Sequence, residues 1–343
     1  MMAYFEQLKY SKSQAKKAGK IFTNPNTSDA EKEEALNIIN NWRASHSFPL
    51  QILYVHLRRI SNDSVIVAQR LKRLHSITQK LIRFPNMSLT SMQDIGGCRI
   101  IVDSIKDVYD TVNSLKKSRM RHILKEEYDY LKEPKADGYR SYHIVYSYNS
   151  DRNKTYNGLF IEIQVRTHIQ HLWATAVETI DTFTNESLKL GKGSQENKEF
   201  FIFVSKLLQL YEECEYDLET VKNSNQLNDF LHFNATKKII QKLISIKVAG
   251  EVLENINASE IQGYYLLKFD KANGSVTVTS YSKKQIEKAT DEYDNLEKNS
   301  TENENIVLVS TSSFKALKQA YPNYFVDIAE FLSLIRKFLD LKN

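Results

Sequence analysis

The sequence predicts an α+β protein, and three segments of its 343 residues carry that prediction. Residues 159–166 alternate apolar and polar side chains, the period of two expected for a strand with one face on a core. Residues 196–243 repeat apolar side chains every three or four positions, which indicates long helices. Residues 264–280 contain two short strand patterns around the turn sequence DKANG. Together these patterns predict β-sheet flanked by helices.

The chain is long enough for more than one domain, and 41% hydrophobic residues can supply separate cores. We expect a first domain over residues 1–190, a helical connector over 191–258 and a small α+β module over 259–343. After its two strands, the module is expected to contain an acidic helix near 283–296, a strand at 306–310 and helices that end at Leu341. The polar segment 299–305 is predicted to be a loose linker.

Composition favours a cytoplasmic enzyme of nucleotides or nucleic acids. No apolar run approaches the length that spans a membrane, and the N-terminal sequence has no hydrophobic signal core. Cys98 and Cys214 fall in different predicted elements, so we expect no disulfide. The net charge is +5, and basic side chains gather in two groups, namely Lys9, Lys12, Lys16 and Lys20, and Lys116, Lys117, Arg119 and Arg121. Each group suits a phosphate backbone, although a solvated lysine face gives the same pattern.

The strand at 159–166 should place Glu162, Gln164 and Arg166 on one face. A solvated sheet edge is the alternative for such a face. Upstream, Asp94 precedes a short apolar strand at 98–102. Two carboxylates, Asp94 and Glu162, would form the oxygen site that Mg²⁺ prefers when it also binds substrate phosphates. A simple turn before two glycines is the other interpretation of Asp94.

Between these strands, Pro134 to Gly138 has the composition of a turn. Lys135 lies in it, and Tyr139 follows the glycine directly. Such a turn offers backbone N–H groups and cations to phosphate oxygens, and the tyrosine offers a ring on which a base can stack. Taken alone, the segment also fits an ordinary lysine-rich loop.

The segment 65–83 is predicted as a single helix. On it, Arg70, Arg73 and Ile77 would lie on one side, and Lys72, Ser76 and Lys80 on a neighbouring stripe. Basic residues on a helix are commonly its solvated face. Here the stripe would also suit a triphosphate.

In order and spacing, these residues resemble the synthetase domain of RelA/SpoT proteins. The family pattern runs R-x-K-x-x-x-S-I-x-x-K, D-[IL]-x-x-x-R-I, D-Y-x-x-x-P-K-x-x-G-Y-x-S-x-H and E-x-Q-x-R-T, and all four motifs occur here in that order. The matching residues are Arg70, Lys72, Ser76, Ile77, Lys80, Asp94, Arg99, Asp129, Tyr130, Pro134, Lys135, Gly138, Tyr139, Ser141, His143, Glu162, Gln164, Arg166 and Thr167.

The resemblance implies an α+β domain with a mixed sheet of nucleotidyltransferase type. It also implies that the β,γ-pyrophosphate of ATP is transferred to a ribose 3′-hydroxyl with release of AMP. By position, Asp94 and Glu162 would hold Mg²⁺, and Glu162 would help to deprotonate the hydroxyl. The implied ATP ligands are Arg70, Lys72, Ser76 and Lys80, and the implied acceptor ligands are Lys135, Tyr139, His143, Gln164 and Arg166. No His-Asp pair occurs in the sequence, so no hydrolase half is expected.

Two departures bear on the acceptor. Enzymes that make guanosine tetraphosphate and pentaphosphate usually have a lysine just before the D-Y pair, and this chain has Tyr128. The segment HLWATAVETID resembles the toxic small alarmone synthetases, a branch that includes enzymes acting on the 3′-CCA end of tRNA. We therefore favour tRNA over GDP or GTP as acceptor, with an inactive nucleotide-sensing module as the alternative from another class. His168 and His171 are expected to form hydrogen bonds rather than a metal site, because no third zinc-type ligand is near in sequence.

The C-terminal module has no cysteine, and no histidine follows His232, so it cannot build an ordinary zinc site. It contains Tyr321 and Tyr324 in a Y-x-x-Y pattern. This is similar to fused toxin–antitoxin RelA/SpoT proteins of the CapRel kind, in which a zinc-finger-like module covers the ATP site. That resemblance implies self-inhibition through the two tyrosines, with a phage protein as a trigger of release. The alternative is that both rings pack within their own module.

Overall fold

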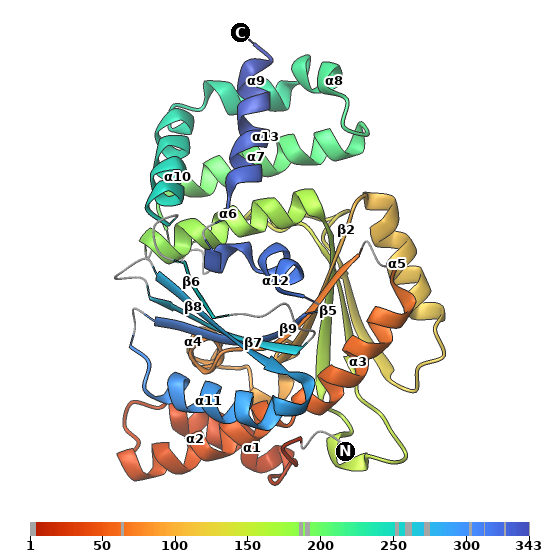
Figure 1. Cartoon of the computed structure of the whole chain (residues 1–343), viewed down its shortest axis with the longest axis vertical. Helices are drawn as coiled ribbons and strands as arrows, with labels where there is room; N and C mark the ends of the chain where they lie inside the picture. The colour runs from red at the N-terminus through yellow and green to blue at the C-terminus, as the bar shows by residue number, and fades with distance from the viewer. Residues whose placement is uncertain are drawn as a thin grey trace.

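The computed structural model describes residues 5–62, 65–184, 188, 193–250, 254–257, 263–270, 275–301, 304–311, 313–325 and 327–342. Within these ranges, the side chains at 248–250, 254–257, 305, 314, 323 and 324 are not described. The molecule has a central sheet with helices on both faces and a helical bundle at one end of its long axis (Figure 1). None of the described helices is long and apolar enough to cross a membrane.

The first half of the sheet comes from residues 66–167. Its strands are β1 (Ile66–Leu71), β2 (Gly96–Val102), β3 (Ile123–Asp129), β4 (Tyr142–Ser147) and β5 (Phe160–Thr167). β2 and β5 run parallel, whereas β1 pairs with β2, β3 with β4 and β4 with β5 in antiparallel fashion. The mixed sheet and the strands expected at 98–102 and 159–166 are therefore confirmed.

Two groups of helices pack against this half of the sheet. α3 (Ser47–Ile60) and α5 (Ile105–Lys117) pack on one face through residues such as Leu53, Val112 and Ile163, all at most 2% exposed. α1 (Lys12–Thr23), α2 (Asp29–Ala44) and α4 (Leu74–Arg83) form a second cluster beside it. The opposite face of β1, β2 and β5 is left for polar side chains.

The single helix expected at 65–83 is wrong. Residues 66–71 form strand β1, and the helix α4 begins only at Leu74. The run VIVAQRL is apolar enough to be a strand or a buried helix, and pairing with β2 on one side and with a C-terminal strand on the other decides it. Arg70 and Lys72 are therefore not on a helical stripe with Lys80.

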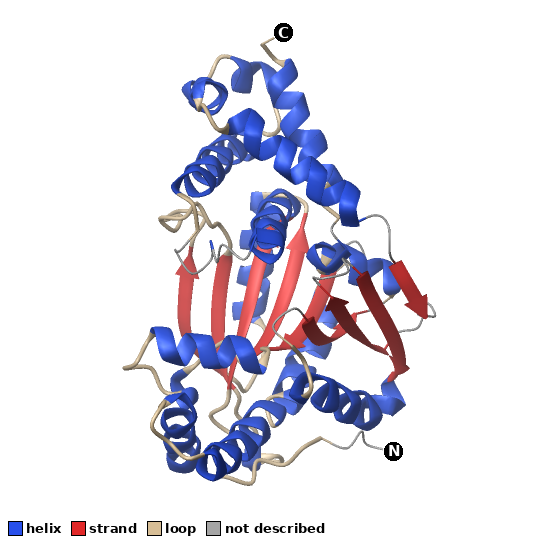
Figure 2. Cartoon of the chain, turned by 90° about the vertical axis from the view of Figure 1, so that its left-hand side faces the viewer, coloured by secondary structure: helices blue, strands red, loops and turns tan. Residues whose placement is uncertain are grey.

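The second half of the sheet is C-terminal. Its strands are β6 (Glu254–Asn257), β7 (Gly263–Asp270), β8 (Ser275–Ser282) and β9 (Glu304–Thr311), with helices α11 (Ile286–Lys298) and α12 (Phe314–Ala320). The strands and the acidic helix expected here are confirmed, whereas most of the DKANG turn lies outside the described residues. The sheet order is β3-β4-β5-β2-β1-β9-β7-β8-β6. β9 pairs antiparallel with β1 through Gln69–Ser310 and Arg70–Val309, so the C-terminal module extends the first sheet (Figure 2).

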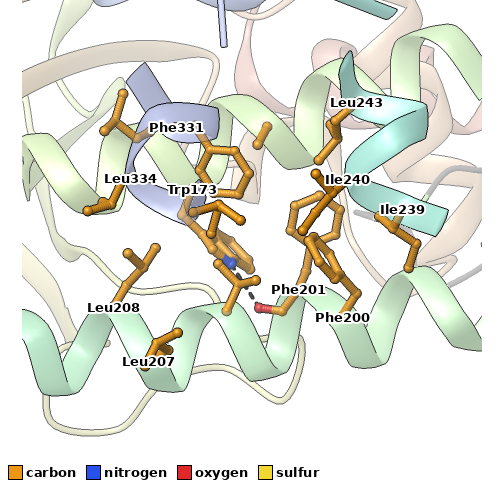
Figure 3. Close-up of a cluster of buried hydrophobic side chains, with 14 of the residues drawn as sticks. Trp173, Phe200, Phe201, Leu207, Leu208, Ile239, Ile240, Leu243, Phe331 and Leu334 are labelled. Atoms are coloured by element: carbon orange, nitrogen blue, oxygen red, sulfur yellow. Dashed lines mark hydrogen bonds between the residues drawn. The ribbon is translucent and has the colours of Figure 1, made fainter. Parts of the chain in front are cut away.

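A helical bundle forms the far end of the molecule. It contains α6 (His168–Thr184), α7 (Gln195–Glu213), α8 (Leu218–Lys222), α9 (Asn225–His232), α10 (Thr236–Gly250) and, from the chain's end, α13 (Ala329–Asp340). Trp173, Phe200 and Phe331 pack in its core, where the Trp173 Nε1–H donates to the Phe201 carbonyl at 2.9 Å (Figure 3). The predicted helices of 196–243 are confirmed, and the last helix joins them although its sequence lies beyond the module's strands.

A buried arginine ties α11 to the first domain. The Arg43 side chain is 2% exposed, its guanidinium lies 4.7 Å from the Tyr293 ring centroid and 3.0 Å from Glu297 Oε2, and its Nε–H donates to the Lys72 carbonyl at 2.7 Å. The other Glu297 oxygen accepts the Leu74 N–H at 2.8 Å. Because no side chain at Arg73 caps α4, Glu297 of the C-terminal module supplies that acceptor. Arg43 of α2 and Glu297 of α11 therefore bind residues 72–74 at their two ends and also contact each other.

Replacing Arg43 by lysine should lower the free energy of unfolding by about 1–2 kcal/mol, because an ammonium cannot reproduce the forked hydrogen bonds and the ring contact. Urea denaturation followed by circular dichroism measures this. Arg59, which is exposed on α3, is the matched control. An equal effect of Arg43→Lys and Arg59→Lys would contradict the assigned role.

Candidate functional site

The face of β1, β2, β4 and β5 that lies opposite α3 and α5 carries the predicted residues. Register places Arg70, Gly97 and Glu162 in one row across the sheet, and Arg99, Gln164 and His143 in the next. A Cβ at Gly97 would meet only the Arg70 carbonyl, at 3.9 Å. This glycine therefore leaves an open floor between an arginine and a carboxylate.

Asp94 lies at the mouth of β2 between two lysines. Its Oδ2 is 2.8 Å from Lys72 Nζ and its Oδ1 is 3.0 Å from Lys80 Nζ. Burial favours the protonated carboxyl, but the two ammonium groups outweigh it and lower the Asp94 pKa to about 2. Asp94, Lys72 and Lys80 thus come together, although they belong to a loop, the residue after a strand and a helix; the sequence patterns did not predict that they pair. Ser76 lies in the first turn of α4, next to them in sequence.

Glu162 is hydrogen-bonded to residues that were predicted to bind the acceptor. Its Oε1 is 3.0 Å from His143 Nδ1, its Oε2 accepts from Gln164 Nε2 at 2.7 Å, and His143 Nε2 is 2.9 Å from the Tyr139 hydroxyl. Burial raises the Glu162 pKa, but the His143 charge more than offsets it, so the net pKa is lowered; Asp94 opposes that lowering. The two carboxylates are therefore close enough to repel each other.

His143 is buried, which disfavours its charge, but Tyr139 and Glu162 favour the imidazolium and raise the His143 pKa to about 9. The unfolded value is about 6.5. The folded pKa is the higher one, so the stabilisation is fully present below pH 6.5 and is lost as the pH rises through 9.

The free energy of unfolding of wild type should therefore exceed that of His143→Gln by about 1–3 kcal/mol at pH 6, and the difference should shrink by pH 9.5. Urea denaturation at pH 6, 8 and 9.5 measures it. His232→Gln, at an exposed position, should follow wild type throughout. A pH-independent difference for His143→Gln would refute the coupling to Glu162.

Helix α7 holds the acceptor loop. Gly138 has φ +90°, a conformation that favours glycine, and its carbonyl accepts from Ser205 Oγ at 2.6 Å. A Cβ at Gly138 would lie 2.9 Å from Ser205 Cβ, so no larger residue fits. The turn predicted at 134–138 is confirmed, with the Gly138 N–H donating to the Lys135 carbonyl at 2.8 Å.

Sequence reasoning missed a buried acid, Glu212 of α7. Its Oε2 is 2.6 Å from Arg140 Nη1, with both side chains at most 4% exposed, and it also accepts from the Thr167 hydroxyl and from Gln170. Arg140 follows Tyr139 and Thr167 follows Arg166. Glu212 therefore joins the acceptor loop to the end of β5. Glu212 lies in a segment whose repeat of apolar residues predicted a packed helix and gave no signal for a buried acid.

Glu212→Gln should lower the free energy of unfolding by about 1–3 kcal/mol, because the Arg140 charge would stay buried without its counter-ion. The neighbouring Glu213→Gln, at an exposed position, is the control. Urea denaturation of both variants gives the comparison, and equal values would show that the ion pair contributes nothing.

Two arginines and a histidine on this face meet the C-terminal module. The Arg70 and Arg99 guanidinium carbons lie 5.9 and 5.1 Å from the centroid of the Tyr321 ring, which is 2% exposed. Arg99 Nη1 donates to the Ala320 carbonyl at 2.7 Å, and His171 Nε2 is 2.6 Å from the Gln319 carbonyl. Carbonyl oxygens at the end of α12 thus accept hydrogen bonds from a guanidinium and an imidazole on this face. The side chain of Tyr324, the other tyrosine predicted to inhibit, is not among those that the structure describes.

Arg166 lies deeper than expected. It is 3% exposed and hydrogen-bonds to His171 Nδ1, and burial and the nearby Arg99 lower its pKa to about 9. Within the described residues, Arg99 Nε and Arg166 Nε have no hydrogen-bond partner. Two buried guanidinium groups so close together, each with an Nε that no described group pairs, favour an anionic ligand, although Glu178 lies near enough to raise the Arg166 pKa. His168 contacts Glu330 at 2.8 Å, so both histidines form hydrogen bonds as expected.

The donor set also bears on a metal. The described residues contain no group of three or more His, Cys, Asp or Glu side chains placed to bind one ion. Asp94 and Glu162 offer hard carboxylate oxygens from the two sides of Gly97, which fits a cation that takes its other ligands from substrate phosphates and water. The two free cysteines, Cys98 and Cys214, take no part.

Residues 69–182 match the family model of the region found in RelA/SpoT proteins, and this segment contains every predicted ATP, metal and acceptor residue. The chain therefore contains a RelA/SpoT region, which confirms that part of the resemblance. The match ends within α6 and leaves out the other helices of the bundle and the C-terminal strands.

Two curated relatives come from Bacillus subtilis (strain 168). GTP pyrophosphokinase YjbM is 32% identical over 117 residues, which cover 34% of this chain and 55% of that protein. GTP pyrophosphokinase YwaC is 35% identical over 112 residues, which cover 31% and 52%. The chain thus spans about half the length of these relatives. Among solved structures, small alarmone synthetase 2 from B. subtilis has a TM-score of 0.45 at 25% identity, covering 52% of this chain and 96% of that one.

Proposed function

We propose that the protein is an ATP-dependent pyrophosphokinase that transfers the β,γ-pyrophosphate of ATP to a ribose 3′-hydroxyl. The observation that carries this proposal is one sheet face on which Asp94 with its two lysines lies across Gly97 from Glu162 with its hydrogen-bonded His143. Phosphoryl-type transfer depends on positioning and on neutralising negative charge, and this face offers cations, carboxylates and rings without an activated nucleophile.

In this reaction the 3′-hydroxyl oxygen attacks the β-phosphorus, the bond from the β-phosphorus to the oxygen of the α-phosphate breaks, and AMP leaves with that electron pair. Glu162 orients the hydroxyl and accepts its proton, and His143 keeps Glu162 ionised. Lys72, Lys80 and Ser76, which precedes Lys80 by one turn of α4, bind the phosphates of ATP, and Arg70 stacks on adenine. Bound by Asp94 and Glu162, Mg²⁺ would neutralise phosphate charge.

For the acceptor we propose the 3′-CCA end of tRNA. Tyr128 stands where a lysine would meet phosphates of a guanine nucleotide, and its hydroxyl donates to Glu126. Lys117 and Arg119 are exposed near β3, although Lys116 is paired with Glu127 at 2.8 Å. The second candidate is synthesis of guanosine tetraphosphate and pentaphosphate from GDP and GTP, which the names of the relatives favour.

We also propose that the C-terminal module restrains the enzyme. The Tyr321 ring lies over Arg70, the residue proposed to stack on adenine, and the carbonyls of Gln319 and Ala320 face His171 and Arg99. Adenine and phosphate oxygens would need these same groups. A partner that binds the open form better, such as a phage protein, would release the module.

The test incubates γ-labelled ATP with deacylated tRNA, or with GDP and GTP. The protein should be full-length Tyr321→Ala, because a truncation near residue 260 would remove β9 from β1 and α13 from the bundle core. Label in tRNA is expected. Label in tetra- or pentaphosphate would select the second candidate, and no label in either would contradict the reaction class.

A further inference from the structure

A short row of aromatic rings leads away from Glu162. Glu162 contacts His143, which is hydrogen-bonded to Tyr139, and the Tyr130 ring lies edge-on to both His143 and Tyr139 with centroids 5.2 and 6.2 Å away. The Tyr128 ring comes next, parallel to Tyr130 within 2° and with centroids 5.8 Å apart. The register of β3 and β4 places Tyr128 opposite His143, so the row lies along the edge of the site.

The outer two rings, Tyr128 and Tyr130, are only partly covered by their neighbours. Parallel rings in full contact lie about 3.5 Å apart, so at 5.8 Å neither ring covers the face of the other completely. Both residues are partly exposed. Lys135 Nζ lies over the Tyr130 ring, 4.4 Å from its centroid, and over the Tyr139 ring at 5.1 Å, so this exposed and flexible side chain places a cation on the row. Flat rings next to an exposed cation are what a single nucleic-acid strand needs.

The row is also held rigidly. Asp129 lies between the two tyrosines in sequence. Its carboxylate accepts hydrogen bonds from the backbone N–H groups of Leu131 and Lys132, at 3.1 and 3.2 Å, and from the Tyr109 hydroxyl at 3.2 Å. The Tyr130 N–H donates to the Ser141 carbonyl at 3.0 Å. A fixed ring costs less ordering entropy on binding than a mobile one.

We propose that Tyr128 and Tyr130 form a stacking platform for the base that precedes the reacting nucleotide, so that the site takes the single-stranded 3′ end of a polynucleotide. The reacting ribose lies at Glu162, its base at Tyr139, and the strand continues past Lys135 to Tyr130 and Tyr128. This rests on the proposed function and extends it: a mononucleotide would use Tyr139 alone, whereas a strand would use the whole row.

The test uses the full-length chain and two probes, a fluorescent RNA hexamer ending in CCA and, as competitor, AMP. Tyr128→Leu keeps bulk without an aromatic face, and Tyr128→Phe keeps the face without the bond to Glu126. Tyr128→Leu should weaken RNA binding by about five- to a hundredfold and leave AMP binding within about twofold, whereas Tyr128→Phe should bind as wild type does. Fluorescence anisotropy gives both affinities.

Equal RNA binding by Tyr128→Leu and wild type, equal losses for RNA and AMP, or no RNA binding by wild type would each overturn the platform. The labelled transfer reaction separates this result from the proposed function. If the protein transfers label to tRNA but Tyr128→Leu binds RNA as wild type does, only the stacking platform is contradicted and the proposed function stands. RNA binding that depends on Tyr128 without transfer to tRNA would support the platform and contradict the proposed acceptor.

Discussion

Glu162→Gln should reduce pyrophosphate transfer by about a thousandfold or more, because the amide has nearly the same shape but neither the negative charge nor the proton affinity of the carboxylate. Glu162 is one of two carboxylates that flank the open floor at Gly97, and His143 and Gln164 hold both of its oxygens. A glutamine keeps one acceptor oxygen, so it can still accept a hydrogen bond from one of these neighbours. The fold should therefore survive, with the loss confined to chemistry.

The measurement is the initial rate of label transfer from γ-labelled ATP, with thermal unfolding followed by circular dichroism as a check of folding. Glu133→Gln is the matched control, since Glu133 is an exposed acid near the acceptor loop. Unchanged transfer by Glu162→Gln would remove Glu162 from metal binding and proton transfer. A variant that unfolds would be replaced by Glu162→Asp, which keeps the charge but shortens its reach and should also lose activity.

Tyr321→Ala should raise the basal activity of the full-length chain by about a hundredfold. The ring is almost fully buried and lies over Arg70 and Arg99, and removing a buried aromatic ring costs about 3–5 kcal/mol. The ring also packs against the module's own core, but its contacts with Arg70 and Arg99 exist in the docked form only, so their loss increases the population of the open form. The expected result is faster transfer without a partner.

Two variants test whether the ring itself is responsible. Tyr321→Phe keeps the ring over both guanidinium groups and should stay as inactive as wild type. Leu317→Ala removes part of the same core cluster but leaves the Tyr321 ring in place, so it should activate the enzyme less than Tyr321→Ala does. Initial rates of all three variants give the comparison. Activation by Tyr321→Phe equal to that by Tyr321→Ala would count against ring stacking as the restraint.

Local sequence patterns predicted the structure correctly where a single strand or turn has a pattern of its own. The alternation at 159–166 correctly placed Glu162 and Gln164 on one face, and the glycine at 138 correctly marked a turn that needs a positive φ. The same kind of reasoning failed at 65–83, because an apolar run becomes a strand only when partners are available. Those partners, β2 and β9, lie about 30 and 240 residues away in sequence.

By itself, the sequence determined the α+β class, most of the strands and the residue types of the site, because periodicity and motif spacing are local properties of the chain. Only the tertiary structure decided that β9 extends the sheet at β1, that Tyr321 lies over Arg70 and Arg99, and that Glu212 lies buried against Arg140. Each of these contacts joins residues that are far apart in sequence. Their free energy comes from burial and ion pairing that exist only once the elements have packed.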